Sequence, residues 1–485
     1  MMRNSILATP SMAIDNSATV YYVSENGSDN NNGTENAPFK TVAKVNEIVA
    51  ARNGAKTVIC FKRGETFRGQ LLAQSNVTYT AYGTGEKPII TVSPENGAIA
   101  SKWTRVEGTD HVWVYEDEMC DVGAIFFNDG ESFAVKQCPK IVNGAFDFGF
   151  EVLGDNEFMS DLSVEDALIL KNTNAASIKG KVYLCCEAGN PGEVYNSIEF
   201  SQRLYVVFLP NYAQNVTVDN LNIRFGGAHG VGGSAQTNLL VQNCEVGYIG
   251  GGIQYNTVSK DDENTYLPAR YGNGVEVNAG CNGYTVQNCW IHDIYDTGIT
   301  HQQGTNHSKE LQFKDVLYTN NLIENCVYSV EYFAKTSEKT GDIVKMINIT
   351  ISDNVMRNAG EGFCEQRYLL ETGWNMGAHI MGWYNSYNYA ENFVIKDNVF
   401  DRCIYWDLSN GSRVNSSFIV VAAASEEYLP TFEGNTYVHY EGSKFGYYGL
   451  NVSEDFTARY FATYTEDFSV VDFLGDTTGE MFFIK

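Results

Sequence analysis

Residues 285–289 read TVQNC, a phrase in which β-branched or apolar residues lead through a polar residue into an asparagine. Close variants recur at 217–221 (TVDNL), 240–244 (LVQNC), 318–322 (YTNNL), 351–355 (ISDNV) and 395–399 (IKDNV). The anchoring asparagines are Asn220, Asn243, Asn288, Asn321, Asn354 and Asn398, with separations of 23, 45, 33, 33 and 44 residues. A basic period of about 22 to 24 residues, with loops inserted on one side, is typical of a parallel β-solenoid whose stacked coils share one core.

Stacked coils place equivalent residues about 4.8 Å apart, so an asparagine repeated at a turn can hydrogen-bond to its own copies. We therefore interpret the repeated asparagines as structural. A second phrase follows the anchors, and in it the apolar residue is expected to point inward and the next residue outward. The predicted outward column is Gln254, Thr300, Glu331 and Cys364.

The sequence around the repeats divides the chain further. Residues 1–17 look disordered or tag-like, and 18–94 predict an N-terminal cap with a short capping helix, followed by the first coils. Residues 95–200 lack the asparagine phrase and alternate aromatic-rich segments with acidic turns, which favours an inserted β-sandwich. Residues 201–427 form the predicted main β-helix, and the acidic, aromatic segment 428–485 is expected to close its other end. The predicted fold class is all-β.

Composition narrows the function. The 485 residues carry a formal net charge of -26, which argues against binding to nucleic acid or to an anionic membrane surface. Hydrophobic residues make up 44% and charged residues 19%, so the chain can bury a large core. The N-terminus is a poor signal peptide and no stretch is long enough to cross a membrane, which favours a cytoplasmic protein, or a secreted one whose leader has been removed.

Eleven cysteines are present, without a CxxC pair or zinc-type spacing. We interpret them as small buried residues in a reducing compartment. No P-loop, Rossmann fingerprint, GxSxG or HExxH motif occurs in a useful context, and GAHGVGG at 227–233 is assigned to tight packing of the coils.

Polar residues that solvation alone does not require gather between residues 225 and 385, which hold five of the seven histidines. Asp296 and Glu331 are the main catalytic candidates, because glycoside hydrolysis needs one carboxyl group to protonate the leaving oxygen and another to attack or to activate water. Glu276 is a third candidate that would tune a neighbour's pKa or bind sugar hydroxyls. The alternative for each is an ordinary solvated or arginine-paired surface acid.

Other polar and aromatic side chains of this region suit sugar binding through hydrogen bonds, charge or stacking. The predicted substrate-binding residues are His301, Gln302, Glu365, Gln366, Arg367, Trp374, His379 and Trp383. Structural roles compete for the histidines, and core packing competes for the tryptophans. No cofactor or metal is predicted; calcium at the acidic run 261–263 is the alternative, although a solvated loop is favoured there.

The opening YYVSENGSD, the following PFKTVAK and the asparagine-anchored coils resemble the right-handed parallel β-helix proteins that act on carbohydrates. The order of cap, first coils, inserted β-sandwich and main coils is similar to the β-helix β-xylosidases. That resemblance implies a retaining mechanism with an aspartate nucleophile and a glutamate acid/base, and these roles would fall on Asp296 and Glu331.

Three functions remain open. The first is an exo-acting glycoside hydrolase that trims short oligosaccharides. The second is a polysaccharide lyase or uronate epimerase, which would need a basic residue and neutralisation of the uronate by Arg367, Lys335 or calcium. The third is a non-catalytic carbohydrate-binding solenoid. In each case the expected partner is an oligosaccharide, without nucleic acid or membrane.

Overall fold

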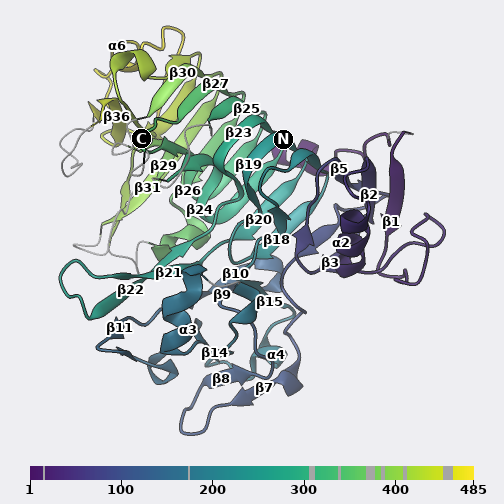
Figure 1. The fold of residues 1–485 in the computed structure, drawn as a ribbon. Helices are drawn as coiled ribbons and strands as arrows, with labels where there is room; N and C mark the ends of the chain where they lie inside the picture. The colour runs from purple at the N-terminus through teal and green to yellow at the C-terminus, as the bar shows by residue number, and fades with distance from the viewer. Residues whose placement is uncertain are drawn as a thin grey trace.

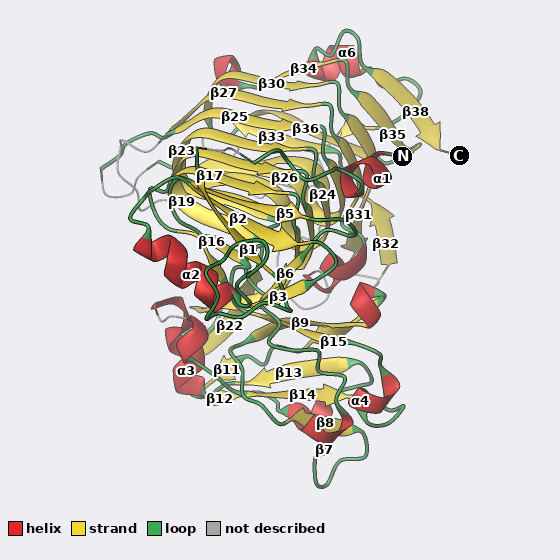
Figure 2. Cartoon of the chain, turned by 90° about the vertical axis from the view of Figure 1, so that its right-hand side faces the viewer, coloured by secondary structure: helices red, strands yellow, loops and turns green. Residues whose placement is uncertain are grey.

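The chain winds into a long parallel β-helix, with a separate β-rich module packed along one side of it (Figures 1 and 2). The structure is a computed structural model, and it describes residues 1–14, 17–172, 175–304, 312–336, 340–367, 377–383, 388–407, 412–451 and 462–484. The coil has three faces, and each face is a parallel β-sheet to which successive coils add one strand. The faces are called A, B and C in the order in which the chain forms them. The predicted right-handed parallel β-helix is confirmed.

The three faces account for most strands. Face A contains β1 (Thr19–Val23), β2 (Thr57–Lys62), β5 (Val77–Tyr82), β17 (Gln214–Asp219), the second halves of β19 (Val231–Gln242) and β23 (Val275–Gln287), β25 (Phe313–Thr319), β27 (Lys345–Ser352), β30 (Tyr389–Lys396) and β34 (Thr431–Glu433). Face B contains β3 (Thr66–Arg68), β6 (Ile89–Thr91), β18 (Asn222–Gly226), β20 (Glu245–Ile249), the first halves of β24 (Trp290–Gln303) and β26 (Leu322–Ala334), β28 (Val355–Ala359), β31 (Val399–Asp407), β35 (Thr436–Tyr440) and β38 (Glu480–Ile484). Face C contains β4 (Leu71–Leu72), β16 (Val207–Leu209), the first halves of β19 and β23, the second halves of β24 and β26, β29 (Ala378–Gly382), β33 (Ile419–Ala423) and β36 (Lys444–Leu450). Two short antiparallel strands, β32 (Ser412–Asn415) and β37 (Ala462–Thr463), pair with β31 and β36.

The repeated asparagines lie at the turn between faces A and B, but they form two ladders instead of one. Asn220, Asn243 and Asn288 adopt left-handed backbone angles, with φ of 59°, 54° and 50°. Strand register aligns Asn288 with Asn320, so Asn321 occupies the interior position that Cys289 holds in the preceding coil. The predicted equivalence of the six anchors is therefore wrong by one residue after the third copy.

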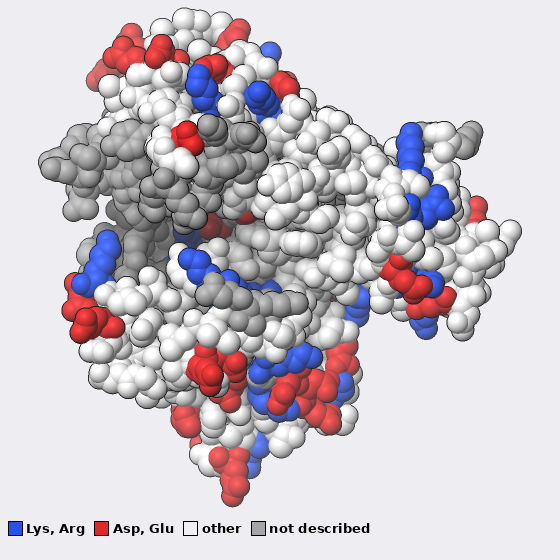
Figure 3. Space-filling model, viewed as in Figure 1, with Lys and Arg blue, Asp and Glu red and all other residues white. Residues whose placement is uncertain are grey.

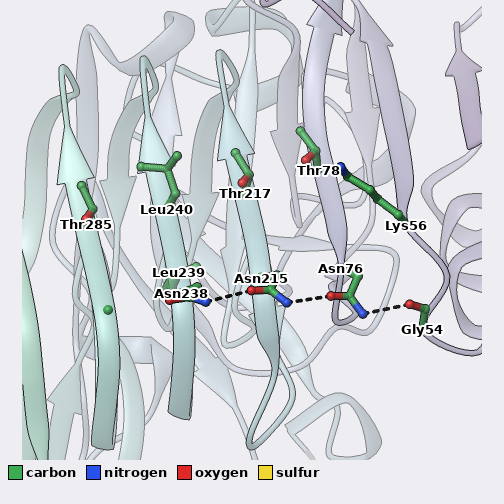
Figure 4. A pocket seen from close by; sticks show the side chains of 11 residues that line it. Gly54, Lys56, Asn76, Thr78, Asn215, Thr217, Asn238, Leu239, Leu240 and Thr285 are labelled. Carbon is green, nitrogen blue, oxygen red and sulfur yellow. Dashed lines mark hydrogen bonds between the residues drawn. The ribbon is translucent and has the colours of Figure 1, made fainter. Parts of the chain in front are cut away.

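The interior ladder is continuous over the later coils. Each amide Nδ2 donates to the Oδ1 of the next copy, over 3.0 Å from Asn321 to Asn354, 2.9 Å from Asn354 to Asn398 and 3.0 Å from Asn398 to Asn435. Asp476 ends the series by accepting from Asn435 at 3.1 Å. A separate ladder follows the starts of the face A strands, where Figure 4 shows Asn238, Asn215 and Asn76 bonded in sequence.

We expect Asn354→Ala to lower the free energy of unfolding by about 2 to 4 kcal/mol, because it strands buried hydrogen-bonding groups on both neighbouring coils. Urea unfolding measures the change. The matched control is Asn392→Gly in β30. Asn392 Nδ2 donates to Asn348 Oδ1 at 3.0 Å in an exposed position, and a glycine there keeps the left-handed backbone while only this solvent-facing bond is lost. A loss for Asn354→Ala no greater than for this control would contradict the structural role of the interior ladder.

Short helices pack on the core at the two ends of the coil. Helix α2 (Val42–Ala51), capped by the Thr41 side chain, buries Val42, Val45 and Val49 in the main core over the first coils. Helix α6 (Val470–Leu474) adds Val470 and Leu474 to the core at the other end.

Within the segment 1–17, residues 2–7 differ from the predicted disorder. Helix α1 (Met2–Leu7) packs on face B, where Ile6 is fully buried against Trp290 and Leu322. The guanidinium of Arg3 lies 3.8 Å from the Trp290 ring centre. The prediction failed because the apolar residues of this segment pack against face B of the coil, and the segment's own sequence does not reveal that contact.

The inserted module is built on two sheets. One has seven strands in the order β15 (Ile198–Gln202), β9 (Val122–Phe127), β10 (Ser132–Lys136), β13 (Glu157–Asp161), β14 (Lys181–Cys185), β8 (Val112–Tyr115) and β7 (Trp103–Arg105). The other has four strands, β12 (Ala145–Phe146), β11 (Ile141–Val142), β22 (Thr265–Tyr271) and β21 (Gly252–Val258). The second sheet therefore combines the module with a hairpin that leaves the main coils after the predicted boundary at residue 200.

Helices α3 (Val164–Ile169) and α4 (Pro191–Val194) also belong to the module. Short 3-10 turns complete the chain: η1 (Ala100–Lys102), η2 (Asn128–Gly130), η3 (Phe150–Val152), η4 (Leu170–Asn172), η5 (Ala175–Ser177), η6 (Gly362–Glu365) and η7 (Glu426–Tyr428). Within the described residues, no helix is long and apolar enough to cross a membrane. All eleven cysteines are free thiols, and every one except Cys138 is buried, as predicted for packing residues.

Candidate active site

Large insertions leave the coils at one corner, between faces B and C. The inserted module separates β6 from β16, the β21–β22 hairpin separates β20 from β23, and η6 lies between β28 and β29. Because consecutive coils stack in register, these insertions rise along the same edge of the helix. They border a cavity of about 440 Å³ whose floor is the outer surface of face C. Figure 3 shows a hollow between the coils and the module.

Two outward columns of face C supply the floor. Strand register puts Glu276, Thr300 and Glu331 in one column, followed by Met381. The second column contains Asn278, Gln302 and Phe333. The full lining is Tyr205, His229, Gln254, Tyr271, Asn273, Glu276, Asn278, Asp296, Gln302, Glu331, Phe333, Lys335 and Trp383.

The predicted outward column was correct only for Thr300 and Glu331. Gln254 lies on the β21 hairpin strand, although it still reaches the cavity, and Cys364 is buried in η6. The error arose because an apolar pair after an asparagine does not distinguish a coil strand from the start of an insertion.

Glu331 is the most strongly perturbed acid of the cavity. Only 6% of the residue is exposed. Burial, followed by the charge of Asp296, raises the pKa of Glu331 to about 8. Trp383 Nε1 donates to Oε1, and the Thr297 and Thr300 hydroxyls lie 3.3 and 3.4 Å from Oε2. At neutral pH this raised pKa keeps the carboxyl group protonated, and Glu331 lines the cavity.

Asp296 stands beside Glu331 at the corner where β24 turns from face B to face C. Its backbone N–H donates to the carbonyl of Gly272 at 3.1 Å, which fixes the corner against the neighbouring coil. Its Oδ1 accepts from Arg367 Nη1 in an ion pair. The guanidinium also lies 5.7 Å from the Tyr328 ring centre, so its position is set by packing as well as by charge.

Glu276 is held by Asn273 and lies against His229. Asn273 Nδ2 donates to Glu276 Oε2 at 2.6 Å, and His229 Nδ1 lies 3.2 Å from the same oxygen. All three side chains line the cavity. The structure thus brings the three predicted catalytic carboxyl groups, Asp296, Glu331 and Glu276, to one cavity.

The sugar-binding roles predicted for His301 and His379 are wrong. His301 follows the outward Thr300 and therefore points into the core, where Nδ1 lies 2.9 Å from the Tyr318 hydroxyl and the ring stacks on Tyr332. His379 stacks between Phe400 and Phe418 inside the coil. Burial lowers the pKa of each to about 3, as expected for neutral core histidines.

The other predicted binding residues divide between the cavity and its surroundings. Gln302 and Trp383 line the cavity, and Arg367 reaches it through Asp296. Glu365 instead accepts from the backbone N–H of Gly362 at 3.0 Å within η6. Gln366 is buried behind the wall. Its Oε1 accepts from Lys136 N at 3.3 Å and from Arg270 Nη2 at 3.2 Å. Trp374 lies outside the described residues.

Several lining residues were not predicted. Asn278 and Phe333 follow from the period of two along strands already marked by Glu276 and Glu331, so their signal was present in the sequence. Lys335 was predicted only as a basic residue of the rival lyase, and it lines the cavity as well. His229 was hidden in a glycine-rich phrase assigned to packing. Tyr205 and Tyr271 come from segments next to the insertions, whose positions no repeat predicts.

Nothing in the described part of the chain forms a cluster of three or more metal-ligating His, Cys, Asp or Glu side chains. In the acidic run 261–263, Asp262 accepts from Asn264 N at 3.0 Å and from the Thr265 hydroxyl at 2.7 Å. These bonds lower the pKa of Asp262 and shape the β21–β22 turn.

No protein-family profile matches the chain. A stretch of 99 residues is 38% identical to a lacto-N-biosidase of Bifidobacterium longum subsp. longum, and the match spans 18% of this chain and 6% of that protein. Among solved structures, one titled a glycoside hydrolase superposes with a TM-score of 0.50 at 11% identity, covering 90% of this chain and 96% of the other. The complex of XylC with xylose gives a TM-score of 0.44 at 13% identity, covering 88% and 69%. The superposition with the glycoside hydrolase structure agrees with the predicted fold.

Proposed function

We propose that the protein is a glycoside hydrolase in which Glu331 is the general acid and Asp296 the second carboxyl group. The observation that carries the proposal is the difference in environment between the two neighbouring carboxyl groups. One carboxyl group keeps its proton because it is buried, and the other is ion-paired with a guanidinium in the same cavity. Environments that separate the protonation of two neighbouring carboxyl groups assign the acid and the base or nucleophile.

The reaction follows from these positions. Glu331 would protonate the glycosidic oxygen as its bond to the anomeric carbon breaks, while Asp296 attacks that carbon or removes a proton from an attacking water. Arg367 would orient the Asp296 carboxylate through their ion pair. Glu276 is less suited to the second role, because the charge of Asp296 acts more strongly than that of Glu276 on Glu331.

The finer proposal is exo-action on short oligosaccharides, as in a β-xylosidase. A cavity of about 440 Å³ lies within the range that holds a small ligand. The similarity of one segment to a lacto-N-biosidase also supports a hydrolase of oligosaccharides, without identifying this protein's sugar.

The test is incubation of the purified protein with nitrophenyl glycosides, including β-xyloside, arabinofuranoside, fucoside, glucuronide and an N-acetylhexosaminide, together with short oligosaccharides. We expect nitrophenol release from at least one glycoside, or shortening of an oligosaccharide by one unit at a time. Proton NMR of the first product formed gives its anomeric configuration and separates attack by Asp296 from attack by water.

The same incubation tests the rival functions. Lys335 lines the cavity, and a basic side chain there is what a uronate lyase would use. Growth of unsaturated-product absorbance on uronate polymers, without release from any glycoside, would replace the hydrolase by a lyase. Sugar binding without either reaction would leave a binding solenoid.

A further inference from the structure

Asn273 connects three parts of the cavity wall. Its backbone N–H donates to His229 Nδ1 at 2.9 Å, its Nδ2 donates to Glu276 Oε2 at 2.6 Å, and its Oδ1 accepts from the Thr297 N–H at 3.1 Å. One buried asparagine therefore fixes a histidine, a carboxyl group and the strand that follows Asp296.

The bond from Asn273 determines which nitrogen of His229 carries hydrogen. Nδ1 accepts, so its lone pair is occupied and the neutral ring has its hydrogen on Nε2. Burial lowers the pKa of His229, which favours this neutral form. The ring is 4% exposed and held edge-on by Tyr205 and Tyr271, at centroid distances of 4.6 and 5.1 Å. Among the residues that the structure describes, no group accepts from Nε2, and the ring lines the cavity.

Glu276 lies in the same outward column as Glu331, two coils away, which is a backbone separation of about 10 Å at 4.8 Å per coil. The residue between them is Thr300, whose small side chain leaves space above the cavity floor between the two glutamates. A sugar ring placed over Thr300 therefore has Glu331 on one side and the His229–Glu276 pair on the other.

We propose that His229 and Glu276 bind two adjacent hydroxyl groups of one sugar ring as a fixed donor and acceptor, positioned by Asn273. His229 Nε2–H donates to one hydroxyl oxygen, and the Glu276 carboxylate accepts from the neighbouring hydroxyl. The ligand is thus a sugar unit whose two adjacent hydroxyl groups are unsubstituted. This inference rests on the proposed glycoside hydrolase and adds a substrate requirement to it.

The experiment compares His229→Gln with His229→Asn. A glutamine amide nitrogen can take the place of Nε2 and keep the donor, whereas the shorter asparagine amide reaches only the Nδ1 position. We expect His229→Asn to raise KM at least tenfold with a smaller change in kcat, and His229→Gln to restore KM to within about threefold of the wild type. His292→Gln, a buried histidine on face B, controls for loss of fold.

A second measurement separates binding from hydrolysis. Calorimetric titration of the free product sugar and of its monodeoxy analogues is done on the Glu331→Gln variant, with and without His229→Asn. We expect one deoxy analogue to bind as weakly as the full sugar binds to the double variant, because both lack the same hydrogen bond. Equal discrimination among analogues with and without His229 would overturn this inference while leaving the hydrolase intact. Binding of the sugar with this discrimination by a protein that cleaves no glycoside would overturn the hydrolase alone.

Discussion

Replacing Glu331 with glutamine is expected to lower kcat/KM on the order of 10³-fold, because the variant has no proton to give to the leaving oxygen. Glutamine keeps the shape and the local bonds: its Oε1 can accept from Trp383 Nε1, and its amide can donate to the Thr297 and Thr300 hydroxyls. Turnover of the best glycoside from the panel, measured beside circular dichroism, checks the result.

The pH dependence of this loss has a defined direction. In the wild type the acid is active while protonated, so kcat/KM should fall as pH rises past about 8, the raised pKa of Glu331. The residual activity of the glutamine variant should lack this fall. A nitrophenyl substrate with a very acidic leaving group needs less protonation, so its rate should suffer less from the substitution.

The same raised pKa affects stability independently of activity. Unfolded, this carboxyl group has a pKa near 4.5, and folded it is raised to about 8, so between these values the native protein binds the extra proton. The free energy of unfolding therefore decreases as pH rises from about 4.5 to 8. Glu331→Gln removes this decrease, and its melting temperature relative to the wild type should increase from pH 5 to pH 8.

Glu324→Gln is the matched control. Glu324 is on the same strand, is also buried, accepts from Trp290 Nε1 at 2.8 Å and pairs with Arg357, but it faces the opposite side of the coil. We expect its glutamine variant to retain turnover. Equal loss in both variants, or full activity in Glu331→Gln, would remove Glu331 from the acid role.

The sequence was informative about the coils because stacking imposes one physical rule on every turn. An amide side chain that bonds to its own copy favours asparagine in coil after coil, and the spacing of Asn354 and Asn398 preserves this signal despite the inserted loop. The rule does not fix the register by itself. Asn288 and Asn321 differ in position by one residue, and only the pairing of β23 with β25 reveals it.

The alternation of inward and outward side chains along the strands holds more information about the site than the predicted residue roles used. Once Thr300 and Glu331 are assigned outward, His301 must point inward and Gln302 outward, as the structure shows. By contrast, the approach of Arg367 to Asp296 joins residues far apart in the chain through an inserted segment. Insertions carry no repeat, so the residues they bring to the cavity cannot be read from periodicity.

Asp296 provides the second large effect. We expect Asp296→Ala to lower kcat/KM on the order of 10³-fold or more, because no carboxylate remains to attack the anomeric carbon or to activate water. The control is Asp293→Asn on the same strand. Asp293 lies 2.9 Å from His292 Nδ1 on the face B side, and its variant should keep its turnover.

Added azide tests the role of Asp296 directly, because the small anion can enter the space left by the missing carboxylate. Azide would attack the anomeric carbon as the bond to the leaving oxygen breaks and Glu331 supplies the proton, so the product is a glycosyl azide of inverted configuration. We expect at least a tenfold recovery of substrate cleavage in Asp296→Ala and none in the wild type, measured by nitrophenol release, with the configuration determined by NMR.

In Glu331→Ala of a retaining enzyme, azide would instead attack the glycosyl-enzyme intermediate and give the retained configuration. If Asp296→Ala gave the retained product and Glu331→Ala the inverted one, the two roles would be exchanged. Such an exchange would conflict with the raised pKa of Glu331, since a carboxyl group that keeps its proton at neutral pH is a poor nucleophile.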